Sequence, residues 1–137
     1  MLHEELTFQI INAFYTVYNT LGYGFLEKVY ENSLAHELKK RGLKVDQQVP
    51  ICVFYDGVLM GEYFADILVE GRIILELKTA DNISSQHKAQ LLNYLKATEV
   101  EVGLLLNFGP EPKFSRKIFT NDRKQTIVAE TGSLKNP

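Results

Sequence analysis

The sequence predicts a domain of the α/β class, an α+β arrangement built on one mixed sheet, and three observations lead to this prediction. Two stretches near the N-terminus carry apolar residues at helical spacing. Three strand-like runs then follow with only tight turns between them, which predicts an antiparallel meander. A further helix and strand come directly after the meander, so this strand–helix–strand order predicts one parallel pair of strands.

The N-terminal segment predicts two helices. Residues 2–21 carry an apolar stripe, and glycines at 22 and 24 then break the helix. The stripe consists of Leu6, Ile10, Ile11, Phe14, Val17, Tyr18 and Leu21. The second helix is expected from about residue 26 to residue 41, because basic residues fill its last turn and Gly42 suits the position after a helix end.

The middle of the chain predicts the meander. Strands are expected at residues 47–55, 58–69 and 72–79, because these runs are rich in branched and aromatic residues. Asp-Gly at 56–57 and Glu-Gly at 70–71 are tight-turn sequences that suit hairpin connections.

The C-terminal third predicts one more helix and two more strands. Ser84 or Ser85 caps a helix that reaches about Thr98. Residues 100–108 have strand composition, and residues 114–120 are expected to add an edge strand.

Length and composition are those of one globular domain. The 137 residues suffice for one hydrophobic core, and 45% hydrophobic with 23% charged residues excludes a disordered chain. We expect residues 1–130 to form this domain and the small, polar residues 131–137 to form a loose tail.

Charge and cysteine content limit the partners and the compartment. The net charge of −2 and pI of about 5.9 argue against broad electrostatic binding of nucleic acid, although a local basic patch would be compatible with them. The single Cys52 excludes an intramolecular disulfide and suits a reducing cytoplasm. The N-terminus lacks a basic signal-peptide region and no apolar run reaches membrane-spanning length, so we expect a cytoplasmic protein without a membrane segment.

Two acidic residues and a lysine on neighbouring predicted strands are the main candidates for chemistry. Glu76 and Lys78 lie two apart on one strand, so their side chains point to the same face, and Asp66 lies on the hairpin partner. Two carboxylates and one ammonium on a strand face suit a divalent cation beside developing negative charge. A Glu-x-Lys pair is more often a solvated strand face, but these charges interrupt the apolar run at 73–77, where unpaired charge is costly.

Gln90 and Tyr94 lie four apart on the third helix and therefore share one face. Taken singly, Gln90 would be a surface amide and Tyr94 an aromatic residue at the edge of the core. The short crossover after the Glu76–Lys78 strand places this helix beside the carboxyl end of that strand, where α/β sites tend to form. His3, His36 and His87 are too scattered for a metal triad.

Glu27 falls in the first turn of the second helix, where an acidic residue is favoured by exposed N–H groups, or else adds a third carboxylate to the site. Tyr30, one turn further on, either hydrogen-bonds near Glu27, where we expect it to help position the substrate, or fills the core.

Residues 24–30 fit the pattern GxxExxY, and in this the chain resembles the GxxExxY protein family. The resemblance continues in order through residues 63–69, 74–78, 90–98 and 103–108, and it spans nearly all of residues 5–120. That family is similar to a small branch of the PD-(D/E)xK nuclease-like superfamily. The Gln90 and Tyr94 pair is similar to the QxxxY motif of RecB-type nucleases there.

The resemblance implies a restriction-endonuclease-like core, with a central mixed sheet flanked by helices. It implies that Asp66 and Glu76 bind Mg²⁺ or Mn²⁺ with help from the Leu77 backbone carbonyl, and that Glu27 completes the acidic cluster.

The same resemblance implies that Lys78 orients or activates a water molecule, and that Gln90 and Tyr94 position the substrate or the lysine. Many relatives carry His where this chain has Tyr18 and Pro where it has Tyr23, so a function of that His would be missing here.

The sequence thus predicts a metal-dependent nuclease-like domain that hydrolyses phosphodiesters in DNA or RNA. Two other classes stay open. One is a non-catalytic module that binds nucleic acid or protein, with a possible homodimer joining two basic clusters into a groove. The other is a structural protein in which Asp66, Glu76 and Lys78 form a buried salt bridge.

Overall fold

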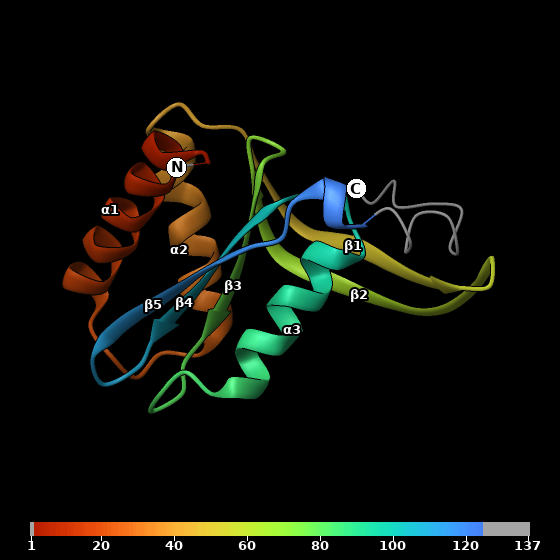
Figure 1. The fold of residues 1–137 in the computed structure, drawn as a ribbon. Helices are drawn as coiled ribbons and strands as arrows, with labels where there is room; N and C mark the ends of the chain where they lie inside the picture. The colour runs from red at the N-terminus through yellow and green to blue at the C-terminus, as the bar shows by residue number, and fades with distance from the viewer. Residues whose placement is uncertain (1, 125–137) are drawn as a thin grey trace.

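The computed structural model describes residues 2–124, which form a five-stranded sheet between helices (Figure 1). The helices are α1 (Glu4–Leu21), α2 (Glu27–Lys40) and α3 (Ser85–Lys96), with a short 3-10 helix at Asn121–Lys124. The strands are β1 (Val45–Tyr55), β2 (Val58–Val69), β3 (Ile73–Lys78), β4 (Val102–Phe108) and β5 (Pro112–Ile118). The tail expected at 131–137 lies outside the described residues.

The sheet is mixed, with strand order β1-β2-β3-β4-β5. The β3–β4 pair is parallel and the other pairs are antiparallel, which confirms the meander and the parallel pair. Both hairpin turns place two successive residues at positive φ: Asp56 and Gly57 at 55° and 75°, and Glu70 and Gly71 at 54° and 64°. This conformation matches the twist of the flanking strands, so these short sequences determine the register of the meander.

The helices cover both faces of the sheet. Helices α1 and α2 lie on one face and α3 on the other (Figure 1). One core cluster joins Phe14, Leu34 and Leu75 under α1 and α2, and a second joins Ile74 and Leu91 under α3. Strand β3 is therefore buried on both faces, as its continuous apolar run predicts. No helix within residues 2–124 is long and apolar enough to cross a membrane.

Several element ends differ from the sequence prediction: β1 begins at Val45 and not at 47, α3 ends at Lys96 and not at about 98, and β5 spans Pro112–Ile118 and not 114–120. Helix α1 begins at Glu4 because His3 has a left-handed φ of 53°. The strand expected from residue 100 begins at Val102, since the Thr98 hydroxyl donates to the Tyr94 carbonyl (2.9 Å) and accepts from the Val100 N–H (3.3 Å). These bonds form a turn where the sequence suggested extended backbone.

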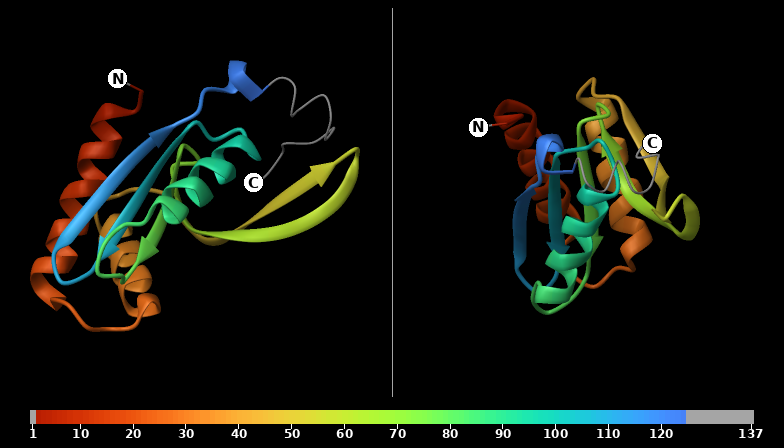
Figure 2. Two further views of the ribbon diagram at one scale, coloured as in Figure 1. Left: turned by 60° about the horizontal axis from the view of Figure 1, so that its bottom comes forward. Right: turned by 45° about the vertical axis from the view of Figure 1, so that its right-hand side comes forward.

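Strand β2 leaves β3 partway along its length. Only Ile67–Val69 of β2 pair with β3, whereas β1 pairs with β2 along both strands. The outer part of the β1–β2 hairpin consequently projects beyond the helices (Figure 2, left). The divergence begins at Asp66, and the candidate site lies there.

The loop after β3 is held by the end of β4. The buried Asn107 side chain accepts from the Ala80 N–H (3.0 Å) and donates to the Ala80 carbonyl (2.9 Å). Gly109 packs so closely on this loop that an added Cβ would collide with the Ala80 carbonyl oxygen. Lys78 immediately precedes this loop, so Asn107 and Gly109 fix the path of the chain that leaves the candidate site.

Gly109→Ala should therefore destabilise the protein by about 1–3 kcal/mol, because the backbone it meets cannot move aside without breaking the Asn107 bonds. Urea denaturation measures this change. Gly61→Ala is the matched control, since its Cβ would make ordinary van der Waals contact with the Tyr63 ring, 3.6 Å from Cε2. Equal destabilisation by the two substitutions would contradict the close packing at Gly109.

Candidate active site

The Glu76 side chain accepts a hydrogen bond from the β2 backbone and the Asp66 side chain accepts one from the β3 backbone, at the point where these two strands separate. The Asp66 N–H donates to Glu76 Oε2 and the Leu77 N–H donates to Asp66 Oδ2, both at 2.8 Å. In a continuing ladder these N–H groups would face carbonyls of the opposite strand. The two carboxylates replace those carbonyls, so they satisfy buried donors and lie side by side.

The pKa values of both carboxyl groups are raised in the protein without a bound cation. Burial, and next the charge of Asp66, raises the pKa of Glu76 from 4.5 to about 8, although the bond from the Asp66 N–H opposes the shift. Burial also raises the pKa of Asp66, which the hydrogen bond from Leu77 partly offsets. A cation near these oxygens would favour the charged forms of both groups.

Lys78 follows Glu76 on β3 and is partly buried. The described residues contain three ion pairs, Lys28–Glu31, Lys40–Glu37 and Arg41–Glu37, and none includes Lys78. The reading of Asp66, Glu76 and Lys78 as a buried salt bridge is therefore wrong for this structure. Lys78 lies near enough to both acids to lower their pKa values, so its charge acts on the site without a direct ion pair.

Glu27 is the first residue of α2 and lies toward the same site. Partial burial raises the pKa of Glu27, the Lys78 charge lowers it, and the Asp66 charge raises it. Glu27 is exposed, whereas Glu76 is 5% exposed. It borders the Asp66 and Glu76 pair from the helix side.

Tyr30 is fully buried and supports the segment that leads into Glu27. Its hydroxyl donates to the Gly22 carbonyl (2.6 Å) and accepts from the Phe25 N–H (3.2 Å). Its ring stacks on Phe108 with centroids 4.4 Å apart. Tyr30 thus fixes the α1–α2 connection, which determines where Glu27 lies.

Glu31 and Gln48 are neighbours of the site that the sequence analysis missed. Glu31 is 4% exposed, and its carboxylate accepts from Lys28, from Gln47 and from Gln48. Gln48 has a left-handed φ of 53° and points its amide at both Glu31 (2.8 Å) and Asp66 (3.4 Å). The helical spacing of Glu31, four after Glu27, was the available signal. No sequence pattern indicated Gln48, because its left-handed backbone conformation depends on how β1 pairs with β2.

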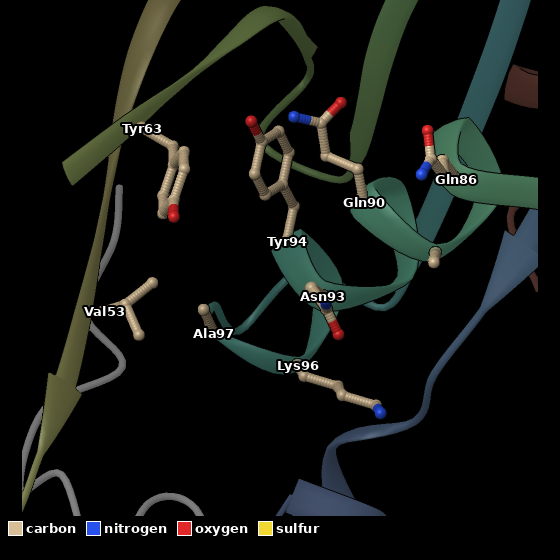
Figure 3. Close-up of a pocket in the computed structure, with 9 residues that line it drawn as sticks. Val53, Tyr63, Gln86, Gln90, Asn93, Tyr94, Lys96 and Ala97 are labelled. Carbon is tan, nitrogen blue, oxygen red and sulfur yellow. The ribbon is translucent and has the colours of Figure 1, made fainter. Parts of the chain in front are cut away.

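Gln90 and Tyr94 share one face of α3, as their spacing predicts, and line a cavity of about 540 Å³ beside the β1–β2 hairpin (Figure 3). Tyr94 is 6% exposed. Burial and then the charges of Glu76 and Asp66 raise the pKa of its hydroxyl to about 12. Tyr94 therefore belongs both to the cavity and to the surroundings of the acidic pair.

Two further side chains have structural roles. His87 completes a capping box at the start of α3, in which its Nδ1 accepts from the Ser84 backbone N–H (3.2 Å) and its backbone N–H donates to the Ser84 hydroxyl (3.1 Å). Tyr18 donates from its hydroxyl to the carbonyls of Gly109 (2.7 Å) and Pro110 (2.8 Å). Tyr18 thereby ties α1 to the β4–β5 turn.

The acidic pair offers hard oxygen donors of the kind that Mg²⁺ and Mn²⁺ take. Each carboxylate has one oxygen bound to backbone N–H and a second oxygen pointing elsewhere, with Asp66 Oδ1 receiving only the long Gln48 contact of 3.4 Å. Within residues 2–124 no three or more His, Cys, Asp and Glu side chains are grouped to hold a metal ion. The donor chemistry fits a divalent cation at Asp66 and Glu76, with Glu27 outside the immediate pair.

A family model described as the PD-(D/E)XK nuclease superfamily matches residues 4–118. The match covers most of the chain, so the chain belongs to this superfamily, whose nucleases generally use divalent metal ions. Among solved structures, the chain is similar to the crystal structure of SSO0001, with a TM-score of 0.56 and 22% identity over 77% of this chain. The chain spans 56% of that protein, and the likeness shows the fold alone, a restriction-endonuclease-like mixed sheet flanked by helices. No curated protein matches the sequence.

The stability of the protein without a bound cation should fall as pH rises from about 5 to about 8. Across that window the unfolded chain has released the Glu76 proton, whereas the folded protein retains it because the folded pKa is about 8. The contribution of Glu76 is therefore fully present below the unfolded pKa and lost as pH approaches the folded one, on the order of a few kcal/mol.

Glu76→Gln tests this pH dependence, because the amide keeps an oxygen for the Asp66 N–H and does not titrate. Urea denaturation of both proteins across the window should show Glu76→Gln gaining stability relative to the parent as pH rises. A stability difference that is constant with pH would contradict a raised pKa for Glu76.

Proposed function

We propose that the protein hydrolyses phosphodiester bonds in nucleic acid with the help of Mg²⁺ or Mn²⁺. We also propose that it belongs to the GxxExxY family within the superfamily and works in the cytoplasm. The observation that carries the first proposal is the pairing of Asp66 with Glu76 where β2 leaves β3. Lys78 lies two residues after Glu76 on β3. Superfamily membership supports it.

In this proposal, Asp66, Glu76 and the Leu77 carbonyl hold the cation, and Glu27 adds negative charge from α2. The hydrogen bonds from the Asp66 and Leu77 N–H groups fix the orientation of both carboxylates before any ligand arrives. A bound divalent cation would lower the pKa of a water molecule and offset charge on the phosphate. The Gln48 amide, which donates to Glu31, also contacts Asp66 and helps to orient its carboxylate.

Lys78 supplies positive charge beside the reacting phosphate and orients the attacking water. Gln90 and Tyr94 position the substrate from α3, on the side of the cavity. Tyr30 acts indirectly, since its hydroxyl holds the segment that leads to Glu27.

A second function is a binding module that keeps the nuclease fold without cleavage. The raised pKa of Glu76, about 8, favours it, because a protonated carboxyl at neutral pH is a poor cation ligand. The two functions make different predictions for metal and for Lys78.

Under the first function, Mg²⁺ or Mn²⁺ at about millimolar concentration should raise the melting temperature, because a ligand that binds only the folded state stabilises it. Asp66→Asn should abolish the increase. Asp56→Asn is the matched control, as Asp56 lies in the exposed β1–β2 turn and Asn suits its positive φ. Identical melting curves of the parent with and without metal would count against a metal site.

Removal of Lys78 should reduce the rate of cleavage far more than it reduces affinity. A group that acts on charge developing in the transition state contributes roughly 10²-fold or more to rate. Lys78→Met keeps the aliphatic stem, and Lys39→Met, on the exposed end of α2, is the control for lost charge.

The measurement uses single- and double-stranded DNA and RNA with Mg²⁺ or Mn²⁺, with binding measured in parallel at a fixed salt concentration. If Lys78→Met loses rate and affinity to the same extent, Lys78 contributes to substrate binding and not to the chemical step. A parent protein that binds but cleaves no substrate would favour the binding module.

A further inference from the structure

The cavity beside the acidic pair has the size and shape of a ligand site. Its volume of about 540 Å³ falls within the range of small-molecule pockets. It lies between the projecting β1–β2 hairpin, which contributes Val53 and Tyr63, and the face of α3 that carries Gln90 and Tyr94 (Figure 3). Neither wall belongs to the Asp66 and Glu76 pair, and the proposed substrate-positioning by Gln90 and Tyr94 does not say which part of the substrate the cavity receives.

The walls combine aromatic and amide groups. Tyr63 and Tyr94 face each other with ring centroids 5.8 Å apart and planes at 44° (Figure 3). Tyr63 is 48% exposed whereas Tyr94 is 6% exposed, so Tyr63 is the ring that an incoming group would meet. Gln90 and Asn93 add amide donors and acceptors on the α3 side.

We infer that this cavity binds an unpaired nucleobase of a single-stranded segment of the substrate. An aromatic face offers stacking to any base, and amide side chains can pair with a base edge that no complementary strand occupies. A base inside a duplex has neither its face nor its pairing edge available, so the pocket selects single-stranded or locally opened nucleic acid.

The position of Tyr94 gives this pocket a place in the proposed reaction. Tyr94 lines the cavity and also lies within electrostatic reach of Glu76 and Asp66. A base held against Tyr63 and Tyr94 would therefore place its own backbone beside the acidic pair. The inference rests on the proposed function for this second step, whereas base binding itself does not require cleavage.

The charge of the protein agrees with a site that binds bases more than phosphates. The net charge is −2, so broad attraction for a phosphate backbone is weak. Base–aromatic stacking is open to every base and would supply affinity where attraction for phosphates is weak. An apolar side chain of a protein partner is the other group that such a cavity could accept, and the experiment below separates the two.

The test measures binding by fluorescence anisotropy in a buffer with a chelator, so that no cleavage occurs. The probes are labelled oligodeoxythymidylate and oligouridylate of about 12 nucleotides, the thymidylate duplexed with its complement, and a strand whose central residues are abasic. The parent should bind the intact single strands more tightly than the duplex or the abasic strand. The two single strands report whether the site takes DNA, RNA or both.

Tyr63→Ala should weaken binding of the intact single strand about tenfold, the scale of one lost stacking partner. Tyr63→Phe should bind like the parent because it keeps the ring. Tyr55→Ala is the matched control, since Tyr55 lies on the same hairpin, is 66% exposed and does not line the cavity. Circular dichroism verifies that each variant folds.

Equal affinity for intact and abasic strands, or an unchanged affinity in Tyr63→Ala, would overturn the inference. Absence of any nucleic-acid binding by the parent would overturn it too, and would leave a protein partner as the occupant. If binding depends on Tyr63 but the protein cleaves nothing with either Mg²⁺ or Mn²⁺, base binding in the cavity would be supported and the proposed hydrolysis refuted. If the protein cleaves nucleic acid with metal and Tyr63→Ala changes neither the rate nor the KM, the proposed hydrolysis would be supported and base binding in the cavity refuted.

Discussion

The reciprocal hydrogen bonds between Asp66 and the Glu76–Leu77 segment are the interaction on which the site depends. They occur where β2 turns away from β3 and the ladder between the two strands ends. Separation of two central strands would leave buried N–H groups without partners, at a cost of about 1–3 kcal/mol each. Two carboxylates satisfy those donors, so the structural need created by the divergence also brings acidic oxygens together.

The surrounding elements hold this arrangement from several sides. Gln48 bridges Glu31 of α2 to Asp66, which links the acidic pair to the helix layer. Asn107 holds the loop beyond Lys78, and Tyr18 ties α1 to the turn that follows β4. Each of these contacts joins segments distant in sequence, so the site is positioned by the packed core as a whole.

The sequence predicted the elements well because their signals are local. Apolar spacing, a serine cap and positive-φ turn sequences act over a few residues, and the meander, the parallel pair and α3 were confirmed. Boundaries were wrong where a side chain competes with the backbone, as Thr98 does after α3. The pairing of Asp66 beside Glu76 was predictable because a hairpin brings the two strands together. Gln48 and the cavity wall of Tyr63 were not, since both depend on how the hairpin diverges and curves.

The sequence by itself determined the order of the elements, the class of sheet and the resemblance to the nuclease superfamily, because periodicity and short motifs are written in neighbouring residues. The tertiary structure alone decided that Lys78 makes no ion pair with the acids, that Tyr30 supports the chain before Glu27, and that Tyr63 faces Tyr94 across a cavity. The Lys78 and Tyr63 features arise where β2 leaves β3 and α3 packs against the hairpin, and the Tyr30 feature arises where α2 packs on Phe108 of β4. Long-range packing fixes all three, and no local pattern encodes the distance between segments that meet only in the fold.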